Sequence, residues 1–217
     1  ADELPEARIA ALSGPSFAAD VARDLPTAVT VAGADDVPAI LADALTSTNF
    51  RVYQTDDLNG IEIGGAVKNV IAIACGIAMG RGLGDNARAA LISRGLAEMV
   101  RLGMALGGRQ ETLMGLSGLG DLVLTATGEK SRNYSTGLAL GRGESFADIM
   151  DGRASVVEGA VAAPAVLALA GRHGIEMPIC AAVDDVLAGR LTVDDAASTL
   201  MMRPSGAEFD HAAASKR

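Results

Sequence analysis

One stretch of the sequence places polar side chains inside an apolar helical pattern. Residues 60–80, GIEIGGAVKNVIAIACGIAMG, consist mainly of Gly, Ala, Ile and Val, yet they carry Lys68 and Asn69 side by side. An amine that burial withdraws from water gives up its proton more readily, which suits it to exchange protons with a substrate. Asn69 could then donate a hydrogen bond to a developing oxyanion. The alternative is structural, with Lys68 reaching solvent along its helix or pairing with Glu62.

Small residues surround Lys68 on the expected helix. Gly64, Gly65 and Ala72 stand at i−4, i−3 and i+4, so they share its face. We expect these small residues to leave an open channel in which a substrate can approach the amine. On this interpretation Lys68→Met should keep or raise stability, because an apolar side chain of similar length suits such a helix better than an ammonium group.

Two further stretches carry groups that suit a phosphorylated substrate. GLSGLGDLVLT places Asp121 after a glycine-dense turn, where the N-terminus of an apolar helix favours a carboxylate, although a purely structural N-cap is equally compatible. GEKSRNYS gathers Ser131, Arg132 and Asn133 at another helix start, which is an anion site by construction. The alternative for Arg132 is a solvated surface charge. A lysine, an acid and an anion site together indicate a small phosphorylated alcohol or ketone.

The elements that must position these groups follow two patterns, which change near Asn59. RIAALSG, TAVTVAG and RVYQT are short β-prone runs, and DDVPAILADALTS between the last two predicts a short helix with Asp36 as its cap and Pro38 in its first turn. The order strand, strand, helix, strand is typical of the end of an α/β sheet. We therefore expect residues 1–58 to be the end of such a sheet, with further strands upstream.

Residues 59–217 are helical in pattern almost throughout, so the predicted fold class is mainly α, with a helical domain preceded by the short α/β unit. Helices are expected to open at Asp85 and Ser131, and at Thr192, which forms a capping box with Asp195. The glycine-rich residues 80–86 follow a helix and have the wrong spacing for a dinucleotide loop, so we expect a turn there. No segment carries the fingerprint G-x-G-x-x-G after a strand.

Composition narrows the possible partners and compartment. The net charge of −9 without a basic run argues against nucleic acid as a partner. Cys75 and Cys180 each lie in an apolar helical pattern, so we expect buried reduced thiols and a cytoplasmic protein. We expect no membrane span, because no apolar stretch of sufficient length lacks charges, and no metal site. The chain starts with neither methionine nor a signal segment, which we interpret as a soluble piece of a longer protein.

A resemblance to a known family rests on six motifs, which follow one another in the order LSGPSFA, GGAVKNVIAIACGI, GLGDNARAALISRGLAEMVRLG, GLSGLGDLVLT, SRNYSTG and VVEG. They resemble the successive signatures of bacterial NAD(P)-dependent glycerol-3-phosphate dehydrogenases, from about Ile9 to Pro204. The resemblance implies that residues 1–58 are the C-terminal remnant of a Rossmann-type dinucleotide-binding domain and that residues 59–217 form an all-helical substrate-binding and catalytic domain. It also implies NAD or NADP as cofactor, a homodimer, and a supply of glycerol 3-phosphate for phospholipid synthesis.

The resemblance further implies roles at the reacting centre. Lys68 matches the family's proton acceptor, which removes the hydroxyl proton at C2 of glycerol 3-phosphate as hydride leaves for the nicotinamide, or returns it to dihydroxyacetone phosphate in reverse. Asn69 and Asp121 match residues that line the same centre. We accordingly expect Lys68, Asn69 and Asp121 to be catalytic.

Other matched positions are implied to bind substrate or cofactor. The expected substrate-binding residues are Lys68 and Asp121 together with Gly14, Ser16, Ser131, Arg132 and Asn133. The expected cofactor-binding residues are Ala18, Arg132, Val156 and Glu158. The chain departs from the family pattern in lacking the glycine fingerprint and a substrate lysine that the family carries upstream. We therefore expect these 217 residues to be inactive alone.

Two alternatives of different classes remain open. One is a related dehydrogenase with a helical domain, of the β-hydroxyacid or ketopantoate type, which also uses a lysine on a long helix; the SRN and GLGDL motifs argue against it. The other is a non-catalytic helical module whose pocket binds only phosphate or a partner subunit. A substrate-specificity assay distinguishes the first alternative from a glycerol-3-phosphate dehydrogenase, and a test for turnover distinguishes the second.

Overall fold

The computed structural model describes residues 7–151 and 155–204, and it begins with a small sheet. The strands are β1 (Ala10–Ser13), β2 (Thr27–Gly33) and β3 (Phe50–Thr55), in the order β1-β2-β3. β1 runs antiparallel to β2, with Ala10 opposite Gly33, and β3 runs parallel to β2, with Thr27 opposite Phe50. The short helix α1 (Ala18–Val21) follows β1, and α2 (Val37–Leu45) connects β2 to β3. The three strands and α2 lie where the sequence predicts them, whereas α1 was not predicted.

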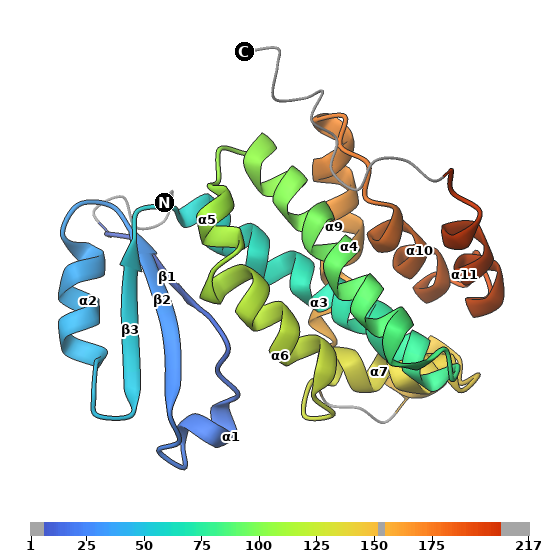
Figure 1. Ribbon diagram of the computed structural model, residues 1–217, viewed down its shortest axis with the longest axis horizontal. Coiled ribbons are helices and arrows are strands. Elements are labelled where there is room, and N and C mark those ends of the chain that lie inside the picture. Colours follow the sequence, from blue (N-terminus) through green and yellow to red (C-terminus); the bar gives the residue numbers. More distant parts are fainter. Residues whose placement is uncertain (1–6, 152–154, 205–217) are drawn as a thin grey trace.

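The sheet has a small core of its own. Val29, Val31 and Val52 are buried, and they pack with Ala42 of α2. Val29 and Val31 are two residues apart, so they project from the same face of β2, and α2 covers that face (Figure 1). The predicted start of α2 is confirmed, with Asp36 as N-cap and Pro38 in the first turn.

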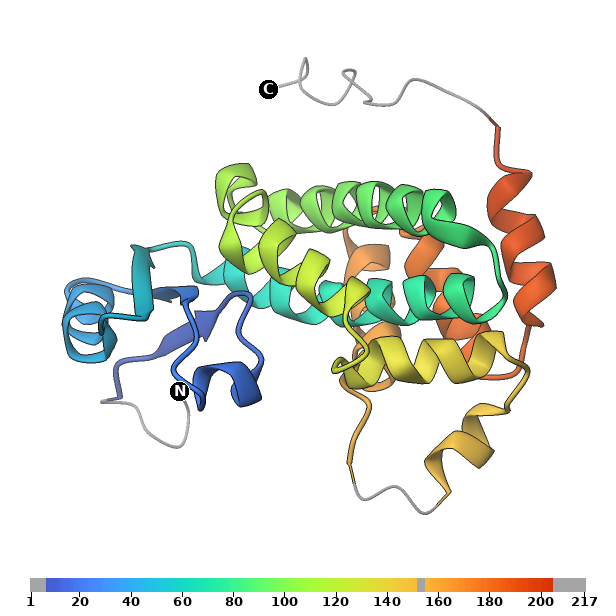
Figure 2. The same ribbon diagram turned by 60° about the horizontal axis from the view of Figure 1, so that its bottom comes forward.

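The rest of the described chain is helical and is arranged around one long helix, α3 (Figures 1 and 2). The helical elements are α3 (Leu58–Gly80), α4 (Gly84–Ala105), α5 (Gln110–Leu113), the π-helical turn η1 (Leu116–Gly120), α6 (Asp121–Thr127), α7 (Arg132–Gly141), α8 (Phe146–Met150), α9 (Glu158–Arg172), α10 (Pro178–Leu187) and α11 (Val193–Met201). The predicted mainly α fold with a short α/β unit is thereby confirmed. The division into domains at residues 58 and 59 stays a prediction, and it coincides with the start of α3.

α3 is the core helix of the helical region. It packs against α4, α6, α7 and α9, so apolar residues on most of its circumference are buried. Figure 2 shows α3 running between α4 and α7. Helices approach closely where side chains are smallest, and glycines of α3 and α7 face each other here. A Cβ at Gly137 would lie 2.1 Å from the Ile73 carbonyl oxygen, and one at Gly76 would lie 2.1 Å from that of Tyr134.

Burial also explains the hydrophobicity of α3. By length and composition Leu58–Gly80 is apolar enough to cross a bilayer, although it carries Glu62 and Lys68. In the structure 61% of its most apolar window is buried against other helices. The hydrophobicity of α3 is therefore explained by its place in the core, since a core helix surrounded by other helices is apolar on nearly all sides.

A buried carboxylate joins α4 to α10. Glu98 is 1% exposed, and its oxygens accept hydrogen bonds from the backbone N–H groups of Ile179 (2.7 Å) and Cys180 (3.2 Å) in the first turn of α10. Burial raises the pKa of Glu98, while these N–H groups act in the opposite direction.

Cys180 and Cys75 are free and buried, as predicted, and burial raises the pKa of Cys75 to about 12. Neither thiol is therefore suited to act as a nucleophile.

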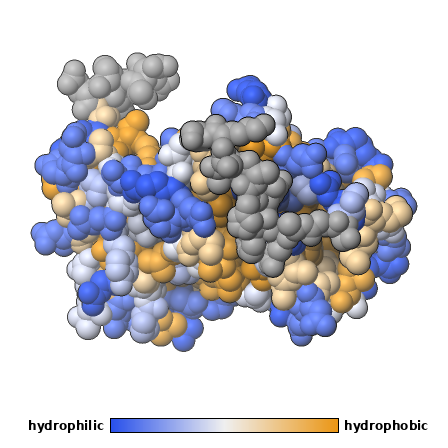
Figure 3. All heavy atoms as spheres, turned by 45° about the horizontal axis from the view of Figure 1, so that its top comes forward, coloured by the Kyte–Doolittle hydropathy of each residue, from blue (hydrophilic) through white to orange (hydrophobic). Residues whose placement is uncertain are grey.

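Several other local predictions are confirmed. Residues 81–83 form the turn between α3 and α4, as expected for this glycine-rich stretch. Thr192 caps α11 by accepting a hydrogen bond from the Asp195 N–H group (3.1 Å), as the capping box predicts. The surface keeps exposed apolar side chains on several elements, including Ile40, Met104 and Val161. On the face in Figure 3 apolar residues gather near the middle and recur among the hydrophilic residues on either side.

The contact between α3 and α7 yields a stability prediction. Gly137→Ala should lower the free energy of unfolding by about 3 kcal/mol, the upper end for overpacking, because the added methyl group meets backbone that cannot rotate away. Gly171→Ala is the matched control, since Gly171 lies in α9 with open space around its Cα. That variant should gain about 0.5–1 kcal/mol from helix propensity. Urea unfolding of both variants checks the prediction, and equal effects would contradict the close approach.

Candidate active site

A pocket of about 510 Å³ lies where the loop between β1 and α1 meets α3, α6 and the start of α7. It is lined by every site residue predicted from the sequence except Val156, namely Gly14, Ser16, Ala18, Lys68, Asn69, Asp121, Ser131, Arg132, Asn133 and Glu158. Val156 is 60% exposed and lies outside the lining. The structure therefore brings together residues that are more than 140 positions apart in the chain.

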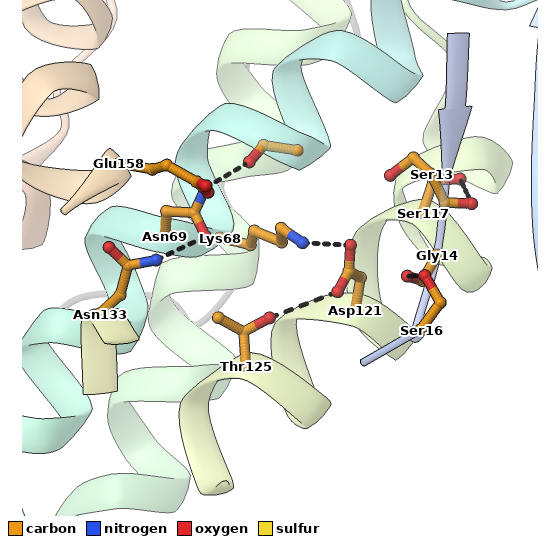
Figure 4. Close-up of polar contacts among 11 residues, drawn as sticks. Ser13, Gly14, Ser16, Lys68, Asn69, Ser117, Asp121, Thr125, Asn133 and Glu158 are labelled. Atoms are coloured by element: carbon orange, nitrogen blue, oxygen red, sulfur yellow. Dashed lines mark hydrogen bonds and ion pairs between the residues drawn. The ribbon is translucent and has the colours of Figure 1, made fainter. Parts of the chain in front are cut away.

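The centre of the pocket is an ion pair between two helices. Lys68 of α3 donates a hydrogen bond from Nζ to Oδ2 of Asp121, the first residue of α6. Figure 4 shows the two side chains pointing toward each other from these helices. The Lys68 side chain is 19% exposed and that of Asp121 is 5% exposed. Lys68 therefore pairs with a buried carboxylate. It neither pairs with Glu62 nor extends into open solvent.

Two opposing effects act on Asp121. Burial raises its pKa, while the Lys68 ammonium group, a hydrogen bond from Thr125 and the backbone of Gly14 lower it, and the net direction is upward. The Thr125 hydroxyl group lies 3.3 Å from Oδ1 of Asp121, one helical turn along α6 (Figure 4). Each carboxylate oxygen thus has its own donor, and the group accepts a proton more readily than an ordinary aspartate.

The three small residues beside Lys68 differ in what they do. Gly65 lines the pocket, and a Cβ there would meet nothing closer than the Ser13 hydroxyl group at 4.0 Å. Gly64 instead lets η1 pack closely, because a Cβ would lie 2.7 Å from the Ser117 carbonyl oxygen. Ala72 is fully buried. The expected open channel is therefore formed at Gly65 only, and the other two residues serve packing.

The loop after β1 needs a glycine at residue 14. Its φ of 141° lies in the region that L-residues rarely adopt, and a Cβ would be 3.0 Å from Cα of Val29. Ser16 donates from its hydroxyl group to the Gly14 carbonyl oxygen at 3.1 Å. This local bond holds the turn that brings the loop over Asp121, as Figure 4 shows for Gly14 and Ser16.

Asn69 belongs to a network on the other side of Lys68. Its Nδ2 donates to the Gly65 carbonyl oxygen (3.1 Å) and to Oε2 of Glu158 (3.2 Å), and its Oδ1 accepts from Nδ2 of Asn133 (2.9 Å). Oδ1 of Asn133 in turn accepts from the Gly159 N–H group at 2.8 Å. Both donors of Asn69 are thus engaged, so donation to a substrate oxyanion requires the bond to Glu158 to be exchanged.

The start of α7 has the features of an anion site. Ser131 is the N-cap, and its hydroxyl oxygen accepts from the Tyr134 N–H group at 3.2 Å. Arg132 is half-exposed and donates to Oε1 of Glu158 at 2.9 Å. A guanidinium group beside a helix N-terminus suits a phosphate or a carboxylate, and here a carboxylate of the chain itself is bound. The predicted convergence at Ser131–Asn133 therefore exists, with Arg132 already paired.

The pocket lining also contains residues that the sequence alone did not identify. Ser13, Thr125 and Lys130 contribute polar side chains, and apolar residues such as Ile61 and Phe17 complete the wall. The spacing of Thr125, four residues after Asp121, is a signal that could have identified it. Within residues 7–151 and 155–204, no three His, Cys, Asp or Glu side chains gather in a way that could hold a metal ion.

The fold and the pocket indicate a two-part class of protein, in which an α/β unit adjoins a helical body that carries a polar pocket. Sequence profiles agree: one described as "NAD-dependent glycerol-3-phosphate dehydrogenase C-terminus" matches residues 57–198, and its N-terminal counterpart matches residues 1–38. The chain belongs to the NAD-dependent glycerol-3-phosphate dehydrogenase family.

Individual relatives give the same result. The chain is 62% identical to the glycerol-3-phosphate dehydrogenase [NAD(P)+] of Maricaulis maris, over 94% of this chain and 61% of that protein. It is 59% identical to the glycerol-3-phosphate dehydrogenase [NAD(P)+] of Hyphomonas neptunium, over 95% of this chain and 62% of that protein. The crystal structure of glycerol-3-phosphate dehydrogenase from Coxiella burnetii superposes with a TM-score of 0.89 at 47% identity, covering 93% of this chain and 62% of that one. The chain thus spans about three fifths of the length of these relatives.

The buried pair changes the expectation for Lys68→Met. The substitution leaves the Asp121 carboxylate buried without its cation, so stability should fall, whereas the sequence alone suggested that it would hold or rise. We expect a loss of about 3 kcal/mol at pH 8, the low end for such a change because Lys68 is partly exposed. Asp121→Asn in the same background removes the unpaired charge and should recover most of the loss.

The loss should also depend on pH. In Lys68→Met the pKa of Asp121 in the folded state lies above that in the unfolded chain, because burial raises it and the ammonium group no longer lowers it. The folded state then binds the proton more tightly, so stability is retained at low pH and is lost as the pH rises through the folded-state pKa. Urea unfolding at pH 5 and pH 8, relative to the unsubstituted chain, checks this. An equal loss at both pH values would contradict it.

Proposed function

We propose that the chain supplies the substrate-binding and proton-transfer side of an oxidoreductase that interconverts sn-glycerol 3-phosphate and dihydroxyacetone phosphate with NAD or NADP. The observation that carries this proposal is the buried Lys68–Asp121 pair in a pocket whose rim holds Arg132 at a helix N-terminus. The first group suits proton exchange and the second suits a phosphate, so one pocket serves both ends of a small phosphorylated alcohol.

In the oxidative direction Lys68 takes the proton from the C2 hydroxyl group of glycerol 3-phosphate. The amine must be neutral for that step, and Asp121 is placed to receive the proton that Lys68 carries in the ion pair. Burial raises the pKa of Asp121, which makes this transfer less unfavourable than it would be to an exposed aspartate. In the reductive direction protonated Lys68 polarises the ketone oxygen and returns the proton. Asn69 keeps the wall beside Lys68 in place through its three hydrogen bonds.

The phosphate group is assigned to the start of α7. The first turn of a helix presents backbone N–H groups and the positive end of the helix dipole, and Arg132 adds a planar bidentate donor. Ser131 and Asn133 fix that turn through the N-cap bond and the bond to Asn69. Gly14 and Ser16 form the opposite wall, so we propose that the substrate lies between this loop and α7.

The described residues fit one end of the proposed cofactor. Ala18, Arg132 and Glu158 line the pocket and would contact the nicotinamide half, whereas exposed Val156 would have to be reached from outside. NAD or NADP, when bound, supplies a nicotinamide that accepts the hydride from C2. The sequence carries no glycine fingerprint that would bind the pyrophosphate of the cofactor. We therefore propose that residues 1–217 alone do not catalyse the reaction.

The biological setting is part of the same proposal. The protein acts in the cytoplasm, which is consistent with two buried free thiols, and it supplies glycerol 3-phosphate for phospholipid synthesis. A homodimer stays a prediction that sedimentation can test. The alternatives are a hydroxyacid or ketopantoate-type dehydrogenase and a non-catalytic phosphate-binding module. Preferential turnover of an unphosphorylated hydroxyacid would favour the first, and phosphate binding without turnover in the presence of a complete cofactor-binding domain would favour the second.

Lys68→Arg tests the assigned proton transfer, and it is measured in the presence of a complete cofactor-binding domain. Arginine keeps the positive charge next to Asp121, so the fold should be retained, but the guanidinium group does not give up its proton. Turnover of glycerol 3-phosphate should fall about a hundredfold to ten-thousandfold, the usual range for loss of a general acid–base group. The melting temperature checks that the fold is retained, and steady-state kinetics of the same preparation measure the loss of turnover. Near-normal turnover would remove Lys68 from the proposed chemistry.

A further inference from the structure

Each basic side chain that lines the pocket is paired with a carboxylate of the chain. Lys68 pairs with Asp121, Arg132 with Glu158, and Lys130 with Asp20. The positive charges of the pocket are therefore balanced within the protein itself. An anionic ligand can bind them only by displacing or supplementing these carboxylates, so the pairs determine which cations become available.

The three pairs differ in exposure, and the difference decides which of them can exchange. In the Lys68–Asp121 pair the side chains are 19% and 5% exposed, whereas Lys130 and Asp20 are 58% and 29% exposed. In the Arg132–Glu158 pair the side chains are 54% and 57% exposed, so this pair is exposed as well. An exposed pair changes an equilibrium by about fivefold at most, whereas a charged hydrogen bond to a phosphate is worth about tenfold or more. Lys130 and Arg132 are thus free to change partners, and Lys68 is not.

Lys130 is placed beside the proposed phosphate site. It directly precedes Ser131, the N-cap of α7, and its side chain lines the same pocket as Arg132. Its Nζ lies 2.8 and 3.1 Å from the two carboxylate oxygens of Asp20. Asp20 belongs to α1, which follows the loop that forms the opposite wall. The pair thus connects α1 to the residue that precedes α7, with Lys130 in the pocket lining and Asp20 behind it.

We propose that Lys130 is a second cationic ligand for the anionic group of the substrate. Asp20 pairs with Lys130 when no ligand is bound and releases it when the ligand binds. The inference rests on the proposed function, in which the substrate carries a phosphate. A phosphate dianion has more charge than Arg132 alone neutralises, and Lys130 is the exposed cation next to it in the chain. Asp20 acts as a competitor, because it occupies the same ammonium group that the phosphate needs.

A merely structural role for the pair makes a different prediction. If Lys130 and Asp20 only tie α1 to the start of α7, removal of either partner should loosen the pocket and weaken binding. If Lys130 is a ligand and Asp20 its competitor, the two removals have opposite effects. Lys130→Gln should weaken binding, whereas Asp20→Asn should strengthen it.

The experiment is calorimetric titration of the 217-residue chain with sn-glycerol 3-phosphate, with glycerol as the uncharged control ligand. We expect Lys130→Gln to raise Kd about tenfold, and Asp20→Asn to lower it by up to about fivefold. The double variant should match Lys130→Gln, because the other cation near Asp20, Arg23 at 4.0 Å, does not line the pocket and Asp20 then affects the ligand through Lys130. Arg203→Gln is the matched control, since it removes one positive charge from an exposed pair with Glu176 away from the pocket, and it should leave Kd unchanged.

Arg132→Gln separates this inference from the proposed function. Weaker binding in Arg132→Gln with no change in Lys130→Gln would overturn the role of Lys130 and leave the phosphate site intact. Weaker binding in both Lys130→Gln and Asp20→Asn would make the pair a tether. A gain in Asp20→Asn that persists in the double variant would also overturn the inference. If the unsubstituted chain bound neither ligand, or if neither basic residue affected binding, the assignment of a phosphate site to this pocket would fail as well.

Discussion

The ion pair between Lys68 and Asp121 constrains how α3 and α6 pack, because a carboxylate that is 5% exposed is stable as an anion only if its cation stays beside it. The pair joins α3 to α6, and the segments around it are built to keep the distance short. Gly64 lets η1 pack against α3 directly before α6 begins, and Thr125 holds the second oxygen of Asp121. The proposed chemistry uses the same property, since a pair that cannot separate can still pass a proton between its members.

The surrounding helices explain how α3 tolerates this pair. Close approach to α7 through Gly76 and Gly137 surrounds α3 with protein, so its apolar residues form the core while Lys68 and Asn69 face the pocket. The amide network from Asn69 through Asn133 to the Gly159 N–H group then ties α3 to α7 and to the start of α9. The polar groups of the pocket are thus held by elements that pack on one helix, which restricts their relative motion. Glu98 has a comparable structural role at α10 and takes no part in the pocket.

Local signals predicted most of the elements. The β-prone run of β2, the Pro38 start of α2 and the Thr192 capping box involve neighbours within a few residues, so the sequence alone sufficed. The types of residue at the site were also recognisable, and the family resemblance implied a common centre for Lys68, Asn69 and Asp121, but the pairing of individual side chains was not predicted. Lys68 meets Asp121 across 53 positions, and Lys130 meets Asp20 across 110. Such pairings depend on how helices pack, and neither periodicity nor spacing reports on that. The expected channel at Gly64 and Ala72 was wrong for the same reason.

An NMR titration of the Asp121 side-chain carboxyl carbon, in the unsubstituted chain and in Lys68→Met, tests whether this buried carboxylate can take up the proton of Lys68. We expect Asp121 to titrate above the usual aspartate value of about 4 in the unsubstituted chain, and at a still higher pH when the ammonium group is gone. Titration at or below the usual value, or the same value in both proteins, would contradict it.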